Sequence, residues 1–142
     1  MKGLRIMNSV MIASRKETDI VTFLEFNEYD VEKINDTILR VSRPEELPVF
    51  VSINDNNMYF EVDLGDINSV ADKDLLFKLL DLNTEILPVS FGINNSNPDD
   101  PRLVLVESRE TGDLNDQELL AVFDALELAT DKAEILLAEY IK

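Results

Sequence analysis

Apolar and polar residues alternate along two neighbouring stretches, residues 47–53 and 58–64, with the polar run 54–57 between them. A period of two predicts β-strands with one apolar face, and the polar run favours a turn. In the register that pairs Ile53 with Met58, every apolar residue of one strand faces an apolar residue of the other. A slip of one residue would turn the whole set toward water. The pattern therefore predicts a β-hairpin with a mixed second face, which consists of Phe50, Ser52, Tyr59, Glu61 and Asp63.

Helical or strand-like spacing continues along the rest of the chain. It predicts a helix over residues 15–26, a strand over 37–41, a helix over 71–82, strands over 87–93 and 103–106, and a final helix over 116–141. Helix-start residues precede each helix: the capping box Ser14 to Glu17, then Asp66, Asn68 and Ser69, and then the pair Asn115 and Glu118. The order of helix, three strands, helix, two strands and long C-terminal helix predicts an α+β fold, with an antiparallel sheet packed by helices.

The predicted last helix is long for a chain of this size. At 1.5 Å per residue it would extend roughly 38 Å, whereas a small domain is about 30 Å across. Leu128 and Ile135 also fall outside its main apolar stripe. Two interpretations remain: the helix overhangs the domain and presents apolar surface to a partner, or it is a long core helix with a frayed end.

Charge is distributed unevenly along the chain. The net charge is −16, yet residues 1–16 carry four basic residues and no acid, which leaves −20 on the remainder. We expect a basic N-terminal extension over residues 1–14 and a single α+β domain over 15–142. The acidic surface repels phosphate backbones and anionic lipid, so we predict no nucleic-acid partner.

No stretch reaches the roughly 18 uninterrupted apolar residues of a membrane-spanning helix, so we predict no direct membrane insertion. The apolar patch that follows Lys2 and Arg5 is interrupted by Asn8 and Ser9. No small-x-small cleavage site follows it, which argues against a signal peptide. A cytoplasmic protein is expected.

Residue types restrict the available chemistry. The chain has no cysteine and no histidine, which removes thiolate catalysis, the usual general base and the commonest transition-metal ligand. It contains no glycine-rich phosphate motif, and EF-hand loops started at Asp55 or Asp66 lack the required ligands. Asp99 and Asp100 are interpreted as a solvated turn rather than a weak calcium site. We therefore predict no catalytic residue, no metal and no cofactor.

Surface aromatics give the best indication of function. Phe50 and Tyr59 share the second face of the hairpin with Glu61, and aromatics ringed by polar residues are typical of binding patches. The alternative is that a helix covers this face. Together with Leu128 and Ile135, these three residues are the predicted partner-binding residues.

Four features of the chain together resemble a known family: Leu47-Pro48-Val49-Phe50-Val51-Ser52, the helix end Leu79-Leu80, Leu87-Pro88-Val89-Ser90-Phe91-Gly92-Ile93, and the long acidic terminal helix. That family is the YjfI-like bacterial family of unknown function, and the resemblance covers about residues 15–142. The basic residues 1–14 and the polar loop 94–101 depart from the family. The element order also resembles the type III secretion chaperone fold, whose small acidic members form homodimers and hold partner polypeptides.

These resemblances imply a non-enzymatic interaction module that forms a homodimer. Members of the YjfI-like family are often encoded beside membrane-remodelling coiled coils similar to phage-shock protein A. The resemblance therefore implies an adaptor or regulator in a stress response, with such a coiled coil as its protein partner. The alternative is an export-type chaperone that holds a secreted or partly unfolded cargo.

Overall fold

A computed structural model describes residues 17–68 and 71–140 of the chain. The elements, in chain order, are α2 (Glu17–Phe26), β1 (Asp30–Lys33), β2 (Ile38–Ser42), β3 (Val49–Asn54), β4 (Asn57–Asp66), α3 (Lys73–Asn83), β5 (Ser90–Asn94), β6 (Arg102–Glu110), the short 3-10 helix η2 (Thr111–Asp113) and α4 (Asp116–Ala138). The predicted α+β class with an antiparallel sheet is confirmed. The predicted cap at Ser14 and the basic extension 1–14 lie outside the described residues.

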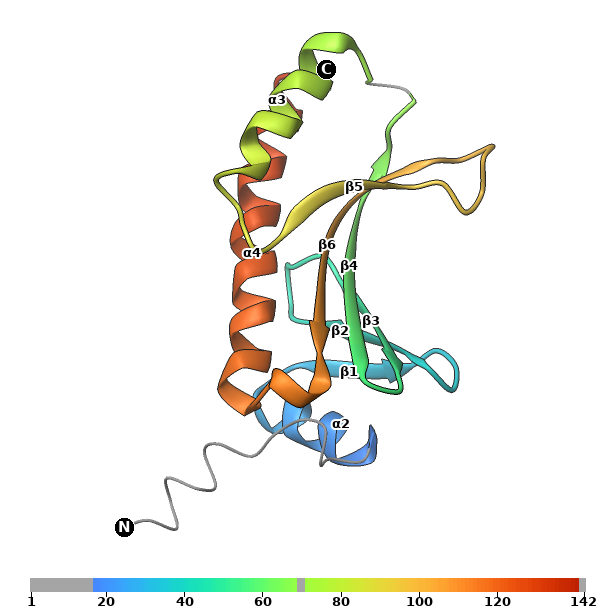
Figure 1. Cartoon of the computed structure of the whole chain (residues 1–142), viewed down its shortest axis with the longest axis vertical. Coiled ribbons are helices and arrows are strands. Elements are labelled where there is room, and N and C mark those ends of the chain that lie inside the picture. The colour runs from blue at the N-terminus through green and yellow to red at the C-terminus, as the bar shows by residue number, and fades with distance from the viewer. Residues whose placement is uncertain (1–16, 69–70, 141–142) are drawn as a thin grey trace.

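The strands form one six-stranded antiparallel sheet in the order β1-β2-β3-β4-β6-β5 (Figure 1). The central hairpin has the predicted register, with Ile53 opposite Met58 and Val51 opposite Phe60. Its turn is tighter than predicted, because Asn54 pairs with Asn57 and only two residues remain between them.

One strand was not predicted, and another was predicted to start too early. Asp30–Lys33 forms strand β1, where the sequence pattern indicated no strand; it pairs along one edge with β2. The strand expected over 87–93 begins only at Ser90 and extends to Asn94. Pairing with a neighbouring strand, rather than local composition, decides both cases, because edge strands need only one partner and tolerate polar residues.

The helices pack on one face of the sheet, which makes a two-layer structure. Figure 1 shows α4 running along this face, with α2 near its N-terminal end. Phe60 of β4 is fully buried, and its ring meets that of Phe123 of α4 edge-to-face, with the centroids 5.7 Å apart. The cap predicted for α4 is confirmed, since the Asn115 side chain accepts a hydrogen bond from the Glu118 backbone N–H at 2.9 Å.

Helix α3 packs beside the C-terminal part of α4 (Figure 1). Leu75 and Leu79 of α3 form a buried cluster with Leu137 of α4. The end of the long helix is therefore covered by this chain rather than left as an overhang. The start of α3 was predicted too early: its cap is Asp72, whose side chain accepts a hydrogen bond from the Leu75 N–H at 2.7 Å.

Candidate functional site

The second face of the sheet is covered by no helix of residues 17–68 and 71–140. The interpretation in which a helix hides Phe50 and Tyr59 is therefore wrong for the described part of the chain. Strand registers place one row of side chains across five strands on this face: Arg40, Phe50, Glu61, Val106 and Ser90. Except for Val104, the residues that surround Glu61 here are at least partly exposed, so this face of the sheet is open.

A hollow of about 530 Å³ lies on this face, where the hairpin of β5 and β6 meets β4. In Figure 1 this hairpin extends away from the helical layer. Valine side chains and a glycine provide the apolar part of the hollow, and an amide, a phenol and a carboxylate provide the polar part. The lining residues are Tyr59, Glu61, Gly92, Ile93, Asn94, Asn95, Ser96, Val104 and Val106.

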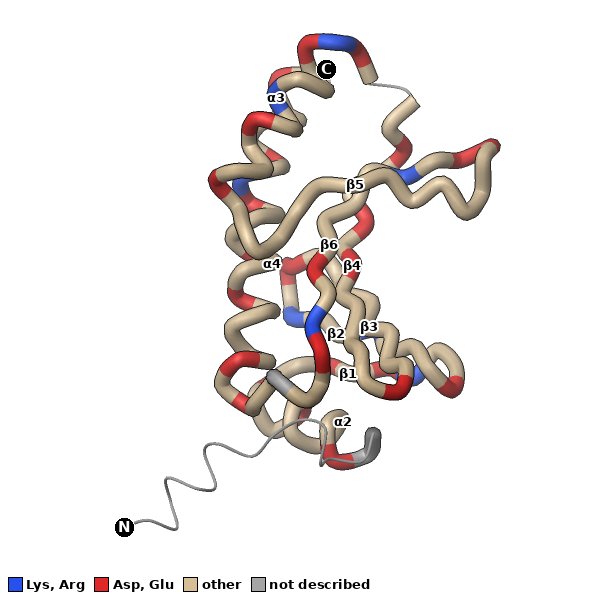
Figure 2. The backbone as a smooth tube through the Cα atoms, viewed as in Figure 1, with Lys and Arg blue, Asp and Glu red and all other residues tan. Residues whose placement is uncertain are grey.

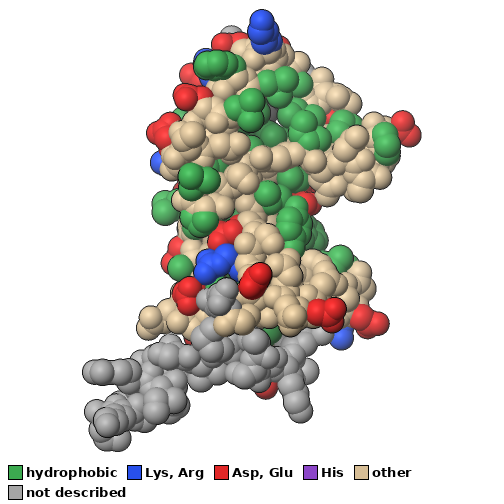
Figure 3. Space-filling model, in the orientation of Figure 1, with side chains coloured by type: hydrophobic (Ala, Val, Ile, Leu, Met, Phe, Trp, Pro, Cys, Tyr) green, Lys and Arg blue, Asp and Glu red, His purple; other side chains and the backbone are tan. Residues whose placement is uncertain are grey.

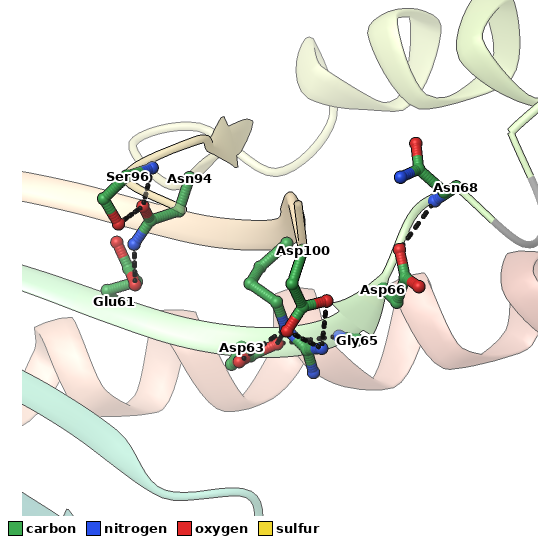
Figure 4. A network of polar contacts seen from close by, with 9 residues as sticks. Glu61, Asp63, Gly65, Asp66, Asn68, Asn94, Ser96 and Asp100 are labelled. Atoms are coloured by element: carbon green, nitrogen blue, oxygen red, sulfur yellow. Dashed lines mark hydrogen bonds and ion pairs between the residues drawn. The ribbon is translucent and has the colours of Figure 1, made fainter. Parts of the chain in front are cut away.

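Neutral donors hold the carboxylate of Glu61 on both sides. The Tyr59 hydroxyl donates to its Oε1 at 2.9 Å, and the Asn94 side-chain amide donates to its Oε2 at 3.0 Å. Asn94 is itself fixed, because its Oδ1 accepts from the Ser96 backbone N–H at 3.1 Å (Figure 4). The β5–β6 hairpin therefore sets the position of an acidic group on β4.

Burial, and then the hydrogen bond to Glu61, raises the pKa of Tyr59 to about 12. Its hydroxyl therefore remains a protonated donor throughout the physiological range, so the direction of the Tyr59–Glu61 hydrogen bond does not change with pH. This hydrogen bond holds the Tyr59 ring and the Glu61 carboxylate together at the edge of the hollow.

The neighbouring acids are arranged differently. Asp63 and Asp100 both bind Arg102, with Nε–Oδ2 at 3.0 Å and Nη1–Oδ1 at 3.1 Å, respectively (Figure 4). Asp63 also accepts from the N–H of Gly65, whose φ of 123° suits glycine at a bulge in β4. Within the described residues, no group of three or more potential metal ligands is brought together, at Asp99 and Asp100 or elsewhere.

Leu128 and Ile135 lie on the outer side of α4, with 65% and 73% of their surfaces exposed. They line two further hollows, of about 170 and 470 Å³, which α4 forms with the segment around Glu85. The structure therefore brings Phe50, Tyr59 and Glu61 together on the open face and places Leu128 and Ile135 in the helical layer, on the opposite face of the sheet.

Exposed apolar side chains form another patch on α3 and β5. Figure 3 shows hydrophobic side chains gathered in the upper half of the molecule, over these elements. Those with large exposed surfaces are Leu76, Phe77, Leu80 and Ile93. Figure 2 shows acidic residues along the length of α4 and on the β5–β6 hairpin, so most of the described surface favours a basic partner.

Sequence reasoning missed Gly92, Asn94, Val104 and Val106 as parts of the hollow. The strand alternation predicts which face each residue occupies. It does not predict that β6 lies between β4 and β5, and this order alone brings Asn94 toward Glu61. A polar residue at the end of a strand is indistinguishable, in one sequence, from an ordinary turn residue.

Comparison with solved structures identifies the architecture. One chain of the heterodimeric ExoU–SpcU complex from the type III secretion system of Pseudomonas aeruginosa matches with a TM-score of 0.66 and 22% identity, over 82% of this chain and 96% of that one. The fold is that of type III secretion chaperones. The Yersinia pestis chaperone SycH, in complex with a fragment of YscM2, matches with a TM-score of 0.55 and 18% identity, over 84% and 94% of the two chains.

The same fold occurs outside that group. YbjN from E. coli, described as a putative transcription regulator, matches with a TM-score of 0.66 and 12% identity, over 92% of this chain and 93% of its own. No family model and no curated protein sequence matches this chain. At these identities the likeness establishes the fold.

Among the described residues, no helix combines the length and the apolar character needed to cross a membrane.

Proposed function

We propose that this protein is a non-enzymatic interaction module that holds a partner protein against the open face of its sheet. The observation that supports this most directly is the hollow beside Phe50, Tyr59 and Glu61, on a sheet face that no described helix covers. Partly exposed aromatics around a concave patch are typical binding hot spots. The acidic surface adds electrostatic attraction for a basic partner and accelerates its association.

The finer identity of the partner comes from the resemblance to the YjfI-like family. On this resemblance, the protein is a cytoplasmic adaptor or regulator of a coiled coil similar to phage-shock protein A and acts in a stress response. Leu128 and Ile135, seven residues apart on the outer side of α4, have the spacing that a partner helix would contact. They form the second part of the proposed binding surface.

A homodimer is also proposed, and the outer side of α3 is the surface that suits it. Leu76, Phe77 and Leu80 are exposed there, and the helix carries Lys73 and Lys78 against Asp74 and Asp81. This balance matters because two copies of a chain with a net charge of −16 repel one another over most of their surfaces.

The second candidate function is an export-type chaperone for a secreted or partly unfolded cargo. It is favoured by the fold shared with SycH, whose structure was solved with a fragment of YscM2. An extended cargo would pair with a free strand edge, whereas a helical partner would leave the strand edges free and contact side chains alone. Within residues 17–68 and 71–140, strand β5 pairs with β6 alone and offers such an edge.

Affinity capture of the full-length tagged protein from its native host tests the proposal, with a high-salt wash and mass spectrometry of the bound proteins. Phe50→Asp should remove a stoichiometric partner while the far-ultraviolet circular dichroism remains native. Phe26→Asp is the matched control, since Phe26 is 86% exposed at the end of α2. A coiled-coil partner supports the adaptor, and secreted proteins support the export chaperone. Equal capture by wild type and Phe50→Asp contradicts binding at this face.

A further inference from the structure

The charge of Glu61 is not balanced within the described part of the chain. None of the ion pairs among residues 17–68 and 71–140 includes Glu61, and its two hydrogen-bond donors, Tyr59 and Asn94, are both neutral. Arg40 shares its cross-strand row but lies two strands away, a distance of about 10 Å. Asp63 and Glu118, in contrast, each bind an arginine directly.

The position of the Glu61 carboxylate strengthens its attraction for a cation. It borders a hollow whose other walls include Val104, Val106 and the ring of Tyr59. Apolar walls lower the local dielectric constant, so a cation that enters such a site is attracted more strongly than at an open surface. The Tyr59 ring adds a face on which a flat cation can stack.

The hydrogen bonds leave the carboxylate both oriented and available. Each oxygen of Glu61 accepts one bond from the protein and retains a second lone pair. Two free acceptor positions on one fixed carboxylate match the two parallel N–H groups of a guanidinium, which binds carboxylates in a bidentate manner. A lysine ammonium would use only one of these positions well.

We propose that the hollow binds the side chain of an arginine presented by the partner protein, with its guanidinium on Glu61. This inference rests on the proposed function and names the group that the open face recognises. The hollow has room because residue 92 is a glycine: a Cβ placed there would meet only Val104 Cγ2, at 3.8 Å. A larger side chain at residue 92 would extend into the space that the arginine occupies.

Titration of the isotope-labelled full-length protein with N-acetyl-arginine amide, followed by two-dimensional amide NMR, tests the proposal. Saturable shifts are expected at Glu61, Gly92–Ser96 and Val104. N-acetyl-citrulline amide, which has nearly the same shape and no charge, should cause none. Glu61→Gln should weaken binding of the arginine probe about tenfold or more, the loss expected for a charge-assisted contact.

Two further variants separate binding from folding. Glu32→Gln removes an exposed carboxylate from β1, across the sheet from the hollow, and should leave binding of the probe unchanged. Gly92→Val should block the probe, because the valine side chain would extend into the hollow. The strand should keep its conformation and Glu61 its position, because valine is favoured in strands. Equal shifts with citrulline, shifts centred elsewhere, or tighter binding of N-acetyl-lysine amide would each overturn the assignment.

The capture experiment is independent of this one. If the arginine probe does not bind but Phe50→Asp still releases the natural partner, the inference about Glu61 is wrong and the proposed function stands. If the probe binds at the hollow and Phe50→Asp retains its partner, the arginine site stands and the proposed binding face for the whole partner is wrong.

Discussion

Glu107 provides the sharpest test of how this fold is stabilised. It lies on β6 opposite Phe60, in the layer between sheet and helices, with only 4% of its surface exposed. One carboxylate oxygen lies 3.3 Å from Arg109 Nη1, and the other has no hydrogen-bond partner among the described residues. Burial raises the pKa of this carboxyl, and the neighbouring guanidinium opposes that shift only in part.

Replacing Glu107 with methionine keeps the length of the side chain and removes its charge. A buried oxygen without a partner costs about 1–3 kcal/mol. The lost ion pair with the partly exposed Arg109 contributes about 1 kcal/mol or less. Arg109 keeps a partner, since its Nη2 lies 3.1 Å from the Glu118 carboxylate. The free energy of unfolding at pH 8 should therefore rise by about 1 kcal/mol, the balance of these two effects.

The gain should depend on pH in a defined direction. Because the pKa of Glu107 is higher in the folded protein than in the unfolded chain, the protonated carboxyl favours folding. That contribution is complete below the unfolded pKa of about 4.3 and is lost as the pH rises through the folded value. Methionine does not titrate, so its advantage over wild type should be smaller at pH 5 than at pH 8.

Urea unfolding followed by far-ultraviolet circular dichroism measures both quantities, since the chain has no tryptophan for fluorescence. Glu110→Gln, at an exposed position on the same strand, controls for the change in net charge. Glu107→Gln keeps the polarity without the charge. A loss of more than about 1 kcal/mol at pH 8 in Glu107→Met would refute the reasoning, as would a gain that is equal at the two pH values.

Further predictions concern the core and a helix cap. Phe60→Ala should lower the free energy of unfolding by about 3–5 kcal/mol, because it removes a fully buried ring packed on Phe123; a midpoint of urea unfolding close to that of wild type would contradict this packing. Asn115→Ala should cost about 1 kcal/mol through loss of the α4 cap, and Asn115→Asp should restore most of it. Thermal unfolding of the two cap variants side by side measures this difference.

Local patterns along the sequence determined much of this structure. Alternation is a property of neighbouring residues, so the register of Val51 with Phe60 and the helical stretches could be predicted from the sequence. The cap at Asn115 could also be predicted, because this cap lies within four consecutive positions, Asn115 to Glu118. The gathering of Phe50, Tyr59 and Glu61 on one face follows from the same periodicity.

Long-range contacts decided the rest. The acidic segment Asp30–Lys33 becomes a strand only because β2 pairs with it, and Glu107 is buried only because α4 packs over its strand. The hollow exists because β6 lies between β4 and β5, which carries Asn94 toward a carboxylate 33 residues away. Strand order depends on how separate elements share one core, and periodicity within each element contains no information about its neighbours. Sequence alone therefore determined the faces, and tertiary structure decided which residues meet on them.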